Sequence, residues 1–275
     1  MPDFSPILPD VDPERRFGGI ERLYGPGTTL RFAAARVAVA GIGGVGCWVV
    51  EALARSGVGA LKLIDPDNLV ESNINRQIHA LDGTLGQAKV TAMATRIRNI
   101  HPQCHVETVE DFLTPENTAA LLHGVDLVVD AIDDARTKAA IAAYCRQARL
   151  PLLMAGGAGG KTDPRRIRVG DLAHTTQDPL LSRVRARLRR EHGFTREPGK
   201  KFGIEVVTSD EPVQRPPACG TASHGLSCAG YGSSMPMTAT IGLFIAARAL
   251  ERLLRLTATL GEAPSSRSEN TFGAR

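Results

Sequence analysis

A glycine-rich turn, Gly41-Ile-Gly-Gly-Val-Gly46, separates a short apolar run from an amphipathic helical pattern. Glycines at such a junction let the chain turn tightly and bring backbone amides and a helix N-terminus against phosphate. Asp65 ends the next apolar run, where a carboxylate can accept hydrogen bonds from both ribose hydroxyls. The pattern predicts a nucleotide site, although it describes NAD dehydrogenases as well as ATP-dependent enzymes.

The polar residues that follow favour triphosphate chemistry. Asn73-Ile-Asn-Arg76-Gln77 comes after the Asp65-Pro-Asp67 turn, Gly86-Gln-Ala-Lys89 opens a helical pattern, and Asp130-Ala-Ile-Asp133 closes a later apolar run. Amide, guanidinium, ammonium and carboxylate groups near the carboxyl ends of strands can meet in one crevice. These groups suit a triphosphate, Mg²⁺ and the departure of pyrophosphate, whereas hydride transfer has no use for them.

The elements that must position these groups alternate along the chain. Strands are expected at 36–40, 60–64, 105–109, 125–129 and 151–154, and helices at 44–55, 86–100, 114–122 and 135–148. Such alternation needs crossover connections and therefore a parallel sheet covered on both faces. The prediction is an α/β fold, Rossmann-like and doubly wound, with a mainly parallel sheet.

A smaller C-terminal extension completes the same domain. It is expected to contain strands at 165–169 and 202–207, a basic helix around 183–190, a long crossover loop at 209–235 and a buried apolar helix at 236–256. The predicted divisions are a flexible arm (1–15), an ATP-binding adenylation core (16–160), this C-terminal part (161–256) and a disordered tail (257–275). The apolar stretch within 236–256 is shorter than the roughly 20 residues of a membrane span, so no stable membrane insertion is expected.

Composition narrows the setting and the chemistry. A net charge of +4 does not by itself indicate a nucleic-acid binder. The five cysteines form no C-x-x-C pair, so neither a zinc site nor a disulfide framework is indicated, and a cytoplasmic location is expected. Cys228, in the long loop, is either a covalent catalyst or an incidental thiol, and we prefer the second interpretation.

Taken in order, the motifs G-x-G-G-x-G, D-x-D, N-x-N-R-Q, G-x-A-K and D-A-I-D resemble the adenylation domain of the HesA/MoeB/ThiF family, which includes ubiquitin-activating enzymes. The resemblance covers about residues 16–155 and implies ATP and Mg²⁺ as cofactors and a homodimer. It assigns the nucleotide to Gly41, Gly43, Gly44, Gly46, Asp65, Asp67, Asn73, Arg76 and Lys89. It also implies that Asp133 holds Mg²⁺ and that Arg76, Lys89 and Asp133 carry the catalysis.

Further motifs resemble one branch of that family, the tRNA threonylcarbamoyladenosine dehydratases, over about residues 16–256. They include Arg16-Phe-Gly-Gly19, Ala155-Gly-Gly-Ala-Gly-Gly160 and Gln177-Asp-Pro179. This resemblance implies ATP-dependent adenylation of the threonyl carboxylate of N6-threonylcarbamoyladenosine at position 37, in the anticodon stem-loop of tRNA. Cyclisation follows with loss of water, because a nitrogen tethered nearby attacks the activated carboxyl group.

Other interpretations stay open. An adenylyltransferase that activates the C-terminus of a ubiquitin-like sulfur carrier is the main alternative, although relatives of that kind hold zinc with C-x-x-C pairs. A scaffold docked to a cysteine desulfurase or sulfur-acceptor system is another. The sulfur-carrier adenylyltransferases also place an arginine near the N-terminus in the partner's site. At the corresponding spacing this chain has Gly19, with Arg16 and Arg22 on either side, and whether either arginine takes that role stays open.

A basic segment suggests where tRNA could bind. On a helix, Arg183, Arg187 and Arg190 share one face. Such a face is either a solvated surface or a track for the phosphates of the anticodon arm, and the family resemblance favours the second.

Overall fold

The computed structural model describes residues 11–214 and 231–261, with side chains up to residue 256. Its centre is a seven-stranded sheet with the order β3-β2-β1-β4-β5-β7-β6. The strands are β1 (Arg36–Ala40), β2 (Ala60–Ile64), β3 (His105–Val109), β4 (Leu127–Asp130), β5 (Leu152–Ala155), β6 (Ile167–Asp171) and β7 (Glu205–Ser209). Every pairing is parallel except that of β6 with β7, so the predicted Rossmann-like α/β fold is confirmed.

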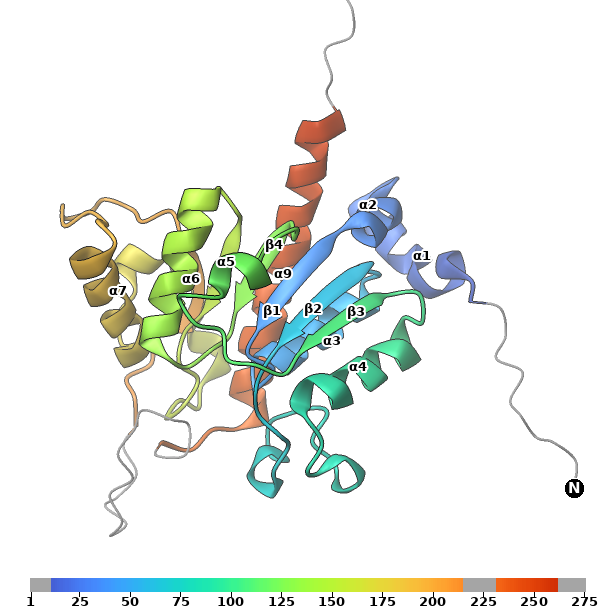
Figure 1. The fold of residues 1–275 in the computed structure, drawn as a ribbon, viewed down its shortest axis with the longest axis horizontal. Helices are drawn as coiled ribbons and strands as arrows, with labels where there is room; N and C mark the ends of the chain where they lie inside the picture. The colour runs from blue at the N-terminus through green and yellow to red at the C-terminus, as the bar shows by residue number, and fades with distance from the viewer. Residues whose placement is uncertain (1–10, 215–230, 262–275) are drawn as a thin grey trace, which may run out of the picture.

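Helices cover both faces of the sheet (Figure 1). They are α1 (Pro13–Tyr24), α2 (Thr28–Ala34), α3 (Gly46–Arg55), α4 (Lys89–Ile100), α5 (Thr118–Leu121), α6 (Ala135–Ala148), α7 (Pro179–Glu191) and α9 (Met235–Gly261). Short 3-10 turns occupy η1 (Glu71–Asn73), η2 (Asp82–Thr84), η3 (Pro164–Arg166) and η4 (Leu172–His174).

Alternate residues of each strand enter different cores, because successive side chains point to opposite faces. Val37 and Val39 of β1 pack with α3, α4 and α9, whereas Ala38 and Ala40 pack with α6. A third cluster joins α6 and α7 to the side of the sheet formed by β5 and β7. The two layers of helices leave the carboxyl ends of the parallel strands as the open edge.

The long apolar helix α9 belongs to the core. Met237, Ile241 and Ile245 are completely buried against the sheet and α3. Gly242 permits the close approach, since a Cβ there would lie 2.7 Å from the carbonyl oxygen of Val45 and 2.8 Å from Cβ of Trp48. Within the part of the chain that the structure describes, no helix is both long enough and apolar enough to cross a membrane.

Several predicted boundaries need correction. Helix α1 begins at Pro13, where Asp12 accepts a hydrogen bond from the amide of Arg15 as N-cap, so the predicted flexible arm is helical over 13–15. Helix α9 reaches Gly261, so the predicted tail is helical over 257–261. Helix α2 was not predicted at all. The middle of the predicted crossover loop, 215–230, lies outside the described residues.

Candidate functional site

A cavity of about 470 Å³ opens at the carboxyl ends of β1, β2, β4 and β5. From β1 the chain continues to β2 and β3 on one side and then crosses to β4 on the other side of β1. Open α/β sheets bind ligands at such switch points. Eight of the nine residues that the sequence assigned to the nucleotide line the cavity, as does Asp133: Gly41, Gly43, Gly44, Asp65, Asp67, Asn73, Arg76 and Lys89. Gly46 alone of the predicted set is outside this lining.

The glycines of the turn have two different functions. Gly41 adopts a φ of +87°, and a Cβ on it would lie 2.8 Å from the carbonyl carbon of Ala131. A Cβ on Gly46 would collide with the carbonyl oxygen of Gly41. By contrast, a Cβ on Gly43 would meet no atom within 4 Å. Gly41 and Gly46 therefore permit the tight turn, while Gly43 leaves open space in front of it.

The Asp65 carboxylate is held firmly at the end of β2. Its Oδ2 accepts a hydrogen bond of 2.7 Å from the amide of Ile42, and its Oδ1 accepts one of 2.9 Å from the amide of Asp67. Each oxygen keeps a second lone pair with which to accept a ribose hydroxyl. Burial raises the pKa of Asp65, and the nearby Lys89 ammonium offsets part of that rise.

Lys89, the first residue of α4, lines the cavity and forms ion pairs with two carboxylates. Its Nζ lies 2.6 Å from Oδ2 of Asp67 and 3.5 Å from Oδ1 of Asp65. The Lys89 side chain is 8% exposed, whereas that of Asp67 is 63% exposed. The Lys89 ammonium is therefore largely shielded from water, while its nearest partner carboxylate is exposed.

The loop that carries Asn73 and Arg76 is braced from within. Oδ1 of Asn73 accepts from the amide of Val70 at 3.1 Å, and a guanidinium nitrogen of Arg76 donates to the carbonyl of Ser72 at 2.6 Å. Trp48 of α3 donates from Nε1 to the carbonyl of Arg76 at 3.0 Å. The indole nitrogen of Trp48 thus ties this loop to α3.

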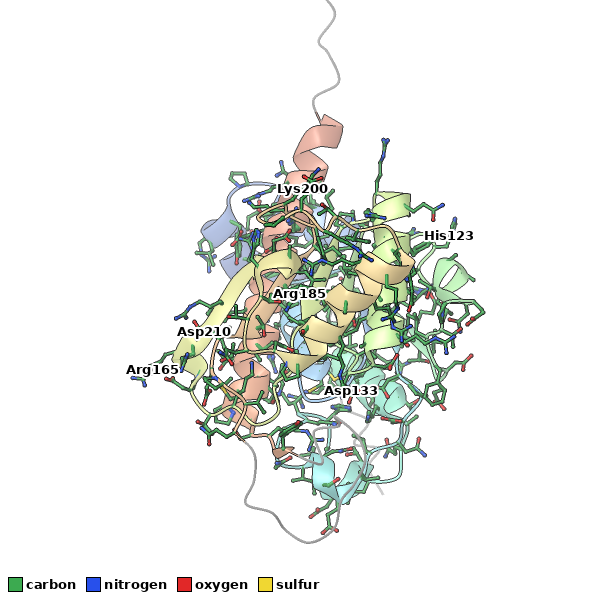
Figure 2. All side chains as sticks on the ribbon, turned by 90° about the vertical axis from the view of Figure 1, so that its left-hand side faces the viewer. His123, Asp133, Arg165, Arg185, Lys200 and Asp210 are labelled. Carbon is green, nitrogen blue, oxygen red and sulfur yellow. The ribbon has the colours of Figure 1, made fainter. Side chains whose placement is uncertain are left out.

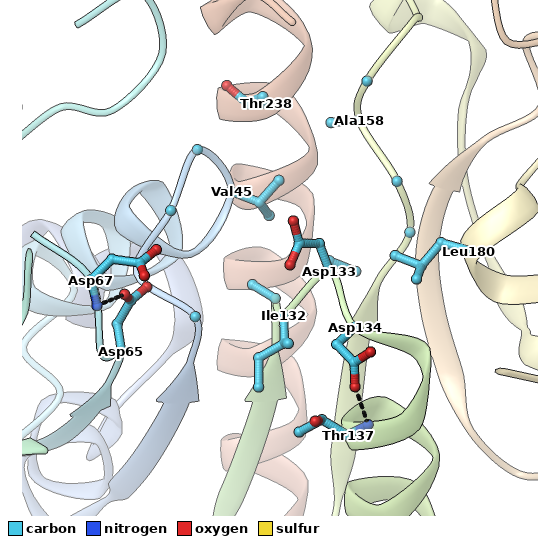
Figure 3. Close-up of a pocket in the computed structure, with 18 of the residues that line it drawn as sticks. Val45, Asp65, Asp67, Ile132, Asp133, Asp134, Thr137, Ala158, Leu180 and Thr238 are labelled. Atoms are coloured by element: carbon cyan, nitrogen blue, oxygen red, sulfur yellow. Dashed lines mark hydrogen bonds between the residues drawn. The ribbon is translucent and has the colours of Figure 1, made fainter. Parts of the chain in front are cut away.

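Asp133 follows β4 and presents an exposed carboxylate to the cavity. Figure 3 shows the carboxylate between Val45 and the loop that carries Ala158. No hydrogen bond or ion pair reaches it from the described residues. Mg²⁺ in nucleotide sites is typically held by one or two carboxylates together with phosphates, so a free carboxylate here fits such an ion. The described residues contain no group of three His, Cys, Asp or Glu that would bind a metal unaided.

The opposite wall of the cavity is built around Asp178, to which the sequence assigned no role. Asp178 accepts hydrogen bonds from the amide of Gly157 at 2.9 Å, from Oγ1 of Thr208 at 2.6 Å and from the amide of Leu181 at 3.0 Å. The last of these caps α7. Asp178 thereby joins two motifs, Ala155–Gly160 and Gln177–Pro179. Their spacing in the sequence gives no indication of this contact.

Lys161 is a second unpredicted group in this wall. Its side chain is buried, and Nζ donates to the carbonyl of Ser209 at 2.7 Å. Burial lowers the pKa of Lys161, and Asp178 and Glu211 offset part of the change. This wall therefore adds a cationic group to the cavity on the side away from Asp65.

The basic helix α7 starts at this cavity, which Pro179 and Leu180 line, and continues along the surface. In Figure 2, Arg185 lies on this helix and Asp133 lies below it. Arg183 and Arg190 are exposed, and both Arg187 and Arg190 form ion pairs with Glu191. None of the three predicted tRNA-binding arginines lines the nucleotide cavity.

The remaining candidates fall elsewhere. Arg16 donates to the carbonyl of Ile100 at 2.6 Å and lines a separate cavity of about 640 Å³, while Arg22 lies on α1. Cys228 lies outside the described residues. The three described cysteines are buried and free, and burial raises the pKa to about 12 for Cys47, about 11 for Cys104 and about 12 for Cys145.

Comparison with known proteins agrees with this geometry. The family model described as the ThiF family matches residues 20–272. The chain belongs to the ThiF family. Within this family, the tRNA threonylcarbamoyladenosine dehydratase of Haemophilus influenzae is 46% identical over 247 residues, which cover 88% of this chain and 94% of that protein. The predicted membership and the narrower resemblance are both confirmed.

Two further similar proteins differ in how much of the chain they match. The crystal structure of the E. coli tRNA N6-threonylcarbamoyladenosine dehydratase in complex with ATP has a TM-score of 0.83 and 44% identity, covering 90% of this chain and 97% of that one. The adenylyltransferase and sulfurtransferase MOCS3 of Anopheles gambiae is 36% identical over 124 residues, which is 45% of this chain and 28% of that protein. Similarity to the dehydratases thus extends through the C-terminal part.

Proposed function

We propose that this protein is an ATP-dependent tRNA threonylcarbamoyladenosine dehydratase. It adenylates the threonyl carboxylate of N6-threonylcarbamoyladenosine at position 37 and releases pyrophosphate. A nitrogen of the same modification then attacks the activated carboxyl group and displaces AMP, so the nucleoside loses one water overall. The strongest support for this function is the match to dehydratases over about nine-tenths of the chain. In addition, one cavity is lined by the residues predicted to bind the nucleotide. A match confined to the nucleotide motifs would support only a general adenylating enzyme.

The cavity suggests a division of labour among its residues. Asp65 accepts the ribose hydroxyls, and Gly43 leaves room for phosphate beside the turn, while Gly44 allows Arg76 and Thr238 to pack closely against it. Arg76 and Lys89 stabilise the negative charge that develops as pyrophosphate leaves, because fixed charges in a dry site need no reorganisation. Asp67 releases Lys89 when phosphate takes its place.

Mg²⁺ is the proposed metal, and Asp133 is the residue that would hold it. When bound, Mg²⁺ neutralises charge on the phosphate oxygens. The free carboxylate of Asp133 suits this role because one or two protein carboxylates normally suffice for Mg²⁺ beside a nucleotide. Asp133 belongs to the cavity wall between Asp65 and the Asp178 loop, so a bound ion would lie among the nucleotide groups.

We further propose that tRNA binds along α7. The helix starts at the cavity and extends for about 20 Å, given its thirteen residues. A nucleotide placed in the cavity would leave the adjoining anticodon stem near Arg183, Arg187 and Arg190, whose charges can neutralise phosphates.

The protein is also proposed to act as a cytoplasmic homodimer, in which exposed apolar side chains such as Leu243 and Phe244 of α9 would be covered. A cysteine desulfurase or sulfur-acceptor partner stays a prediction. Activation of a sulfur carrier is disfavoured because the chain has no C-x-x-C pair and matches such an enzyme over less than half of its length.

Mass spectrometry of tRNA nucleosides tests the function directly. The protein is incubated with ATP, Mg²⁺ and tRNA that carries threonylcarbamoyladenosine, and the expected result is loss of one water from that nucleoside. Matched tRNA without the threonylcarbamoyl group is the control and should not change. ATP–pyrophosphate exchange that needs a ubiquitin-like protein and ignores modified tRNA would contradict the proposal.

A further inference from the structure

A sealed ion pair lies directly beneath the loop that carries Asp133. The ammonium of Lys138, on α6, is 3.0 Å from Oδ1 of Asp130 at the end of β4, and both side chains are 0% exposed. Desolvating two charges costs several kcal/mol for each ion, and apolar residues of similar volume are often as stabilising. Stability alone therefore gives little reason for this pair.

The other contacts of Lys138 all go to the same short turn. Besides Oδ1 of Asp130, Nζ reaches the carbonyl of Ile132 at 2.9 Å and that of Asp130 at 3.3 Å. Oδ1 of Asp130 also accepts from the amide of Ile132 at 3.1 Å. The three donors of one ammonium thus converge on the residues that immediately precede Asp133.

The pair is not arranged for the best possible hydrogen bonding. Oδ2 of Asp130 is buried and has no hydrogen-bond partner among the described residues. An unsatisfied buried oxygen normally costs free energy and needs an explanation. The Asp130–Lys138 pair would be explained if the turn that leads to Asp133 has to be held in a fixed position.

On its other side, Asp133 is followed by a second anchor. Oδ2 of Asp134 accepts from the amide of Thr137 at 2.7 Å and caps α6, as the dashed line in Figure 3 shows. Asp133 therefore lies between two residues that α6 holds in place. Only its own carboxylate is left free, and it points into the cavity (Figure 3).

We propose that Lys138 and Asp130 are positioning residues that hold the Asp133 carboxylate where it meets Mg²⁺ and the nucleotide phosphates. This inference rests on the proposed function. Catalytic groups misplaced by about 1 Å lose about 10²-fold in rate, and residues that orient a metal ligand typically contribute 10–100-fold in metal affinity or activity. Lys138 reaches neither ion nor phosphate; it acts through the backbone of Ile132.

The decisive variant is the double replacement Asp130→Leu with Lys138→Met, which removes both charges and keeps a similar volume. Its melting temperature should stay close to wild type, because no lone buried charge is left. ATP affinity is measured by calorimetry with Mg²⁺ and with EDTA. We expect a 10–100-fold loss of affinity in Mg²⁺, little change in EDTA, and faster amide hydrogen exchange at 132–134.

Two single variants keep the test informative if the double variant does not fold. Asp130→Asn retains an oxygen that can accept from Lys138 and Ile132, so it should keep most of the Mg²⁺-dependent affinity. Lys138→Met removes the contact to Ile132 and should lose it. The matched control is Lys62→Met on β2, where Lys62 pairs with Glu107 away from the cavity.

Wild-type affinity in Mg²⁺ for a folded double variant would overturn the inference, as would equal affinities for Asp130→Asn and Lys138→Met. These outcomes are distinct from failure of the proposed function. Calorimetry with ATP needs no tRNA, so a wild-type protein that binds ATP but leaves modified tRNA unchanged would contradict only the dehydratase assignment.

Discussion

Two lysine–aspartate pairs flank the central strand β1, one beyond β2 and one at the end of β4. Lys89 pairs with Asp65 and Asp67 on the wall of the cavity, and the Asp67 side chain is 63% exposed. Lys138 pairs with Asp130 where both side chains are 0% exposed. The chemical groups are the same, and their access to the cavity differs.

Access determines what each pair can do. An ammonium beside an exposed carboxylate can exchange that partner for a phosphate, as we propose for Lys89. A sealed ammonium has no exchange partner and can only brace the groups around it. The comparison therefore predicts that Lys89 binds the nucleotide and that Lys138 supports the loop of Asp133.

The largest expected effect is on activity at the open pair. Lys89→Met should lower the rate of tRNA dehydration by about 10²–10³, because one fixed charge opposite the developing pyrophosphate is lost. Single-turnover kinetics with modified tRNA measure the change. The control is again Lys62→Met, and near-normal turnover of Lys89→Met would remove Lys89 from the catalytic set.

The second prediction concerns stability. Lys138→Met should lower the free energy of unfolding by about 3–5 kcal/mol, because Asp130 is left as a lone buried charge. Lys89→Met should cost clearly less, since Asp67 is largely exposed to water. Urea denaturation of both variants gives the two values, and similar costs would show that access does not distinguish the pairs.

A third pair, at the far side of the sheet, extends the comparison. Glu205 of β7 is bonded by Arg248 and Arg252 of α9. Burial alone would raise the pKa of Glu205, but the two guanidinium groups outweigh it and lower the pKa. The carboxylate therefore stabilises the fold above its unfolded-state pKa, and this contribution is lost as pH falls through the lower folded-state value.

Glu205→Gln should accordingly lower the free energy of unfolding by about 1–3 kcal/mol at pH 7, with the difference shrinking between about pH 5 and pH 3. Chemical denaturation across this range measures it. A difference that stayed constant with pH would mean that packing and not charge accounts for the loss.

The smallest effect on stability is expected for the surface ion pairs of α7, in which Arg187 and Arg190 bind Glu191. Replacing Arg183, Arg187 and Arg190 together by Gln should cost under about 1 kcal/mol in stability. Affinity for ATP should not change. The slope of log K for tRNA against log salt should flatten by about 2, as three phosphate contacts disappear.

The matched control for this triple variant replaces the arginines around β6, which pair with Asp163 and Asp210: Arg165, Arg166 and Arg168. An unchanged salt slope for the α7 variant, together with a flatter slope for the β6 variant, would indicate that tRNA binds near β6 and not along α7.

The sequence alone determined the fold class and most strand positions, and it predicted residues that the structure gathers around one cavity. Three strands, 36–40, 60–64 and 105–109, match the prediction in full. The first two are mostly buried, short apolar runs bounded by turns, as parallel strands inside a sheet usually are, whereas 105–109 is a largely exposed strand at the edge of the sheet. The glycine turn and Asp65 were found because a phosphate site needs those residue types at fixed places in the chain. Helix α1, which begins at Pro13, was not predicted at all, and the end of α9 at Gly261 was missed, since capping and packing decide such features.

Only the tertiary structure decided which residues support the site. Lys138 reads as an ordinary helical lysine, and its burial depends on β4 and α6 closing over it. Asp178 reads as a helix cap, and its contacts to Gly157 and Thr208 join segments far apart in the sequence. Local patterns encode local geometry, whereas these contacts exist only once the sheet brings distant segments together.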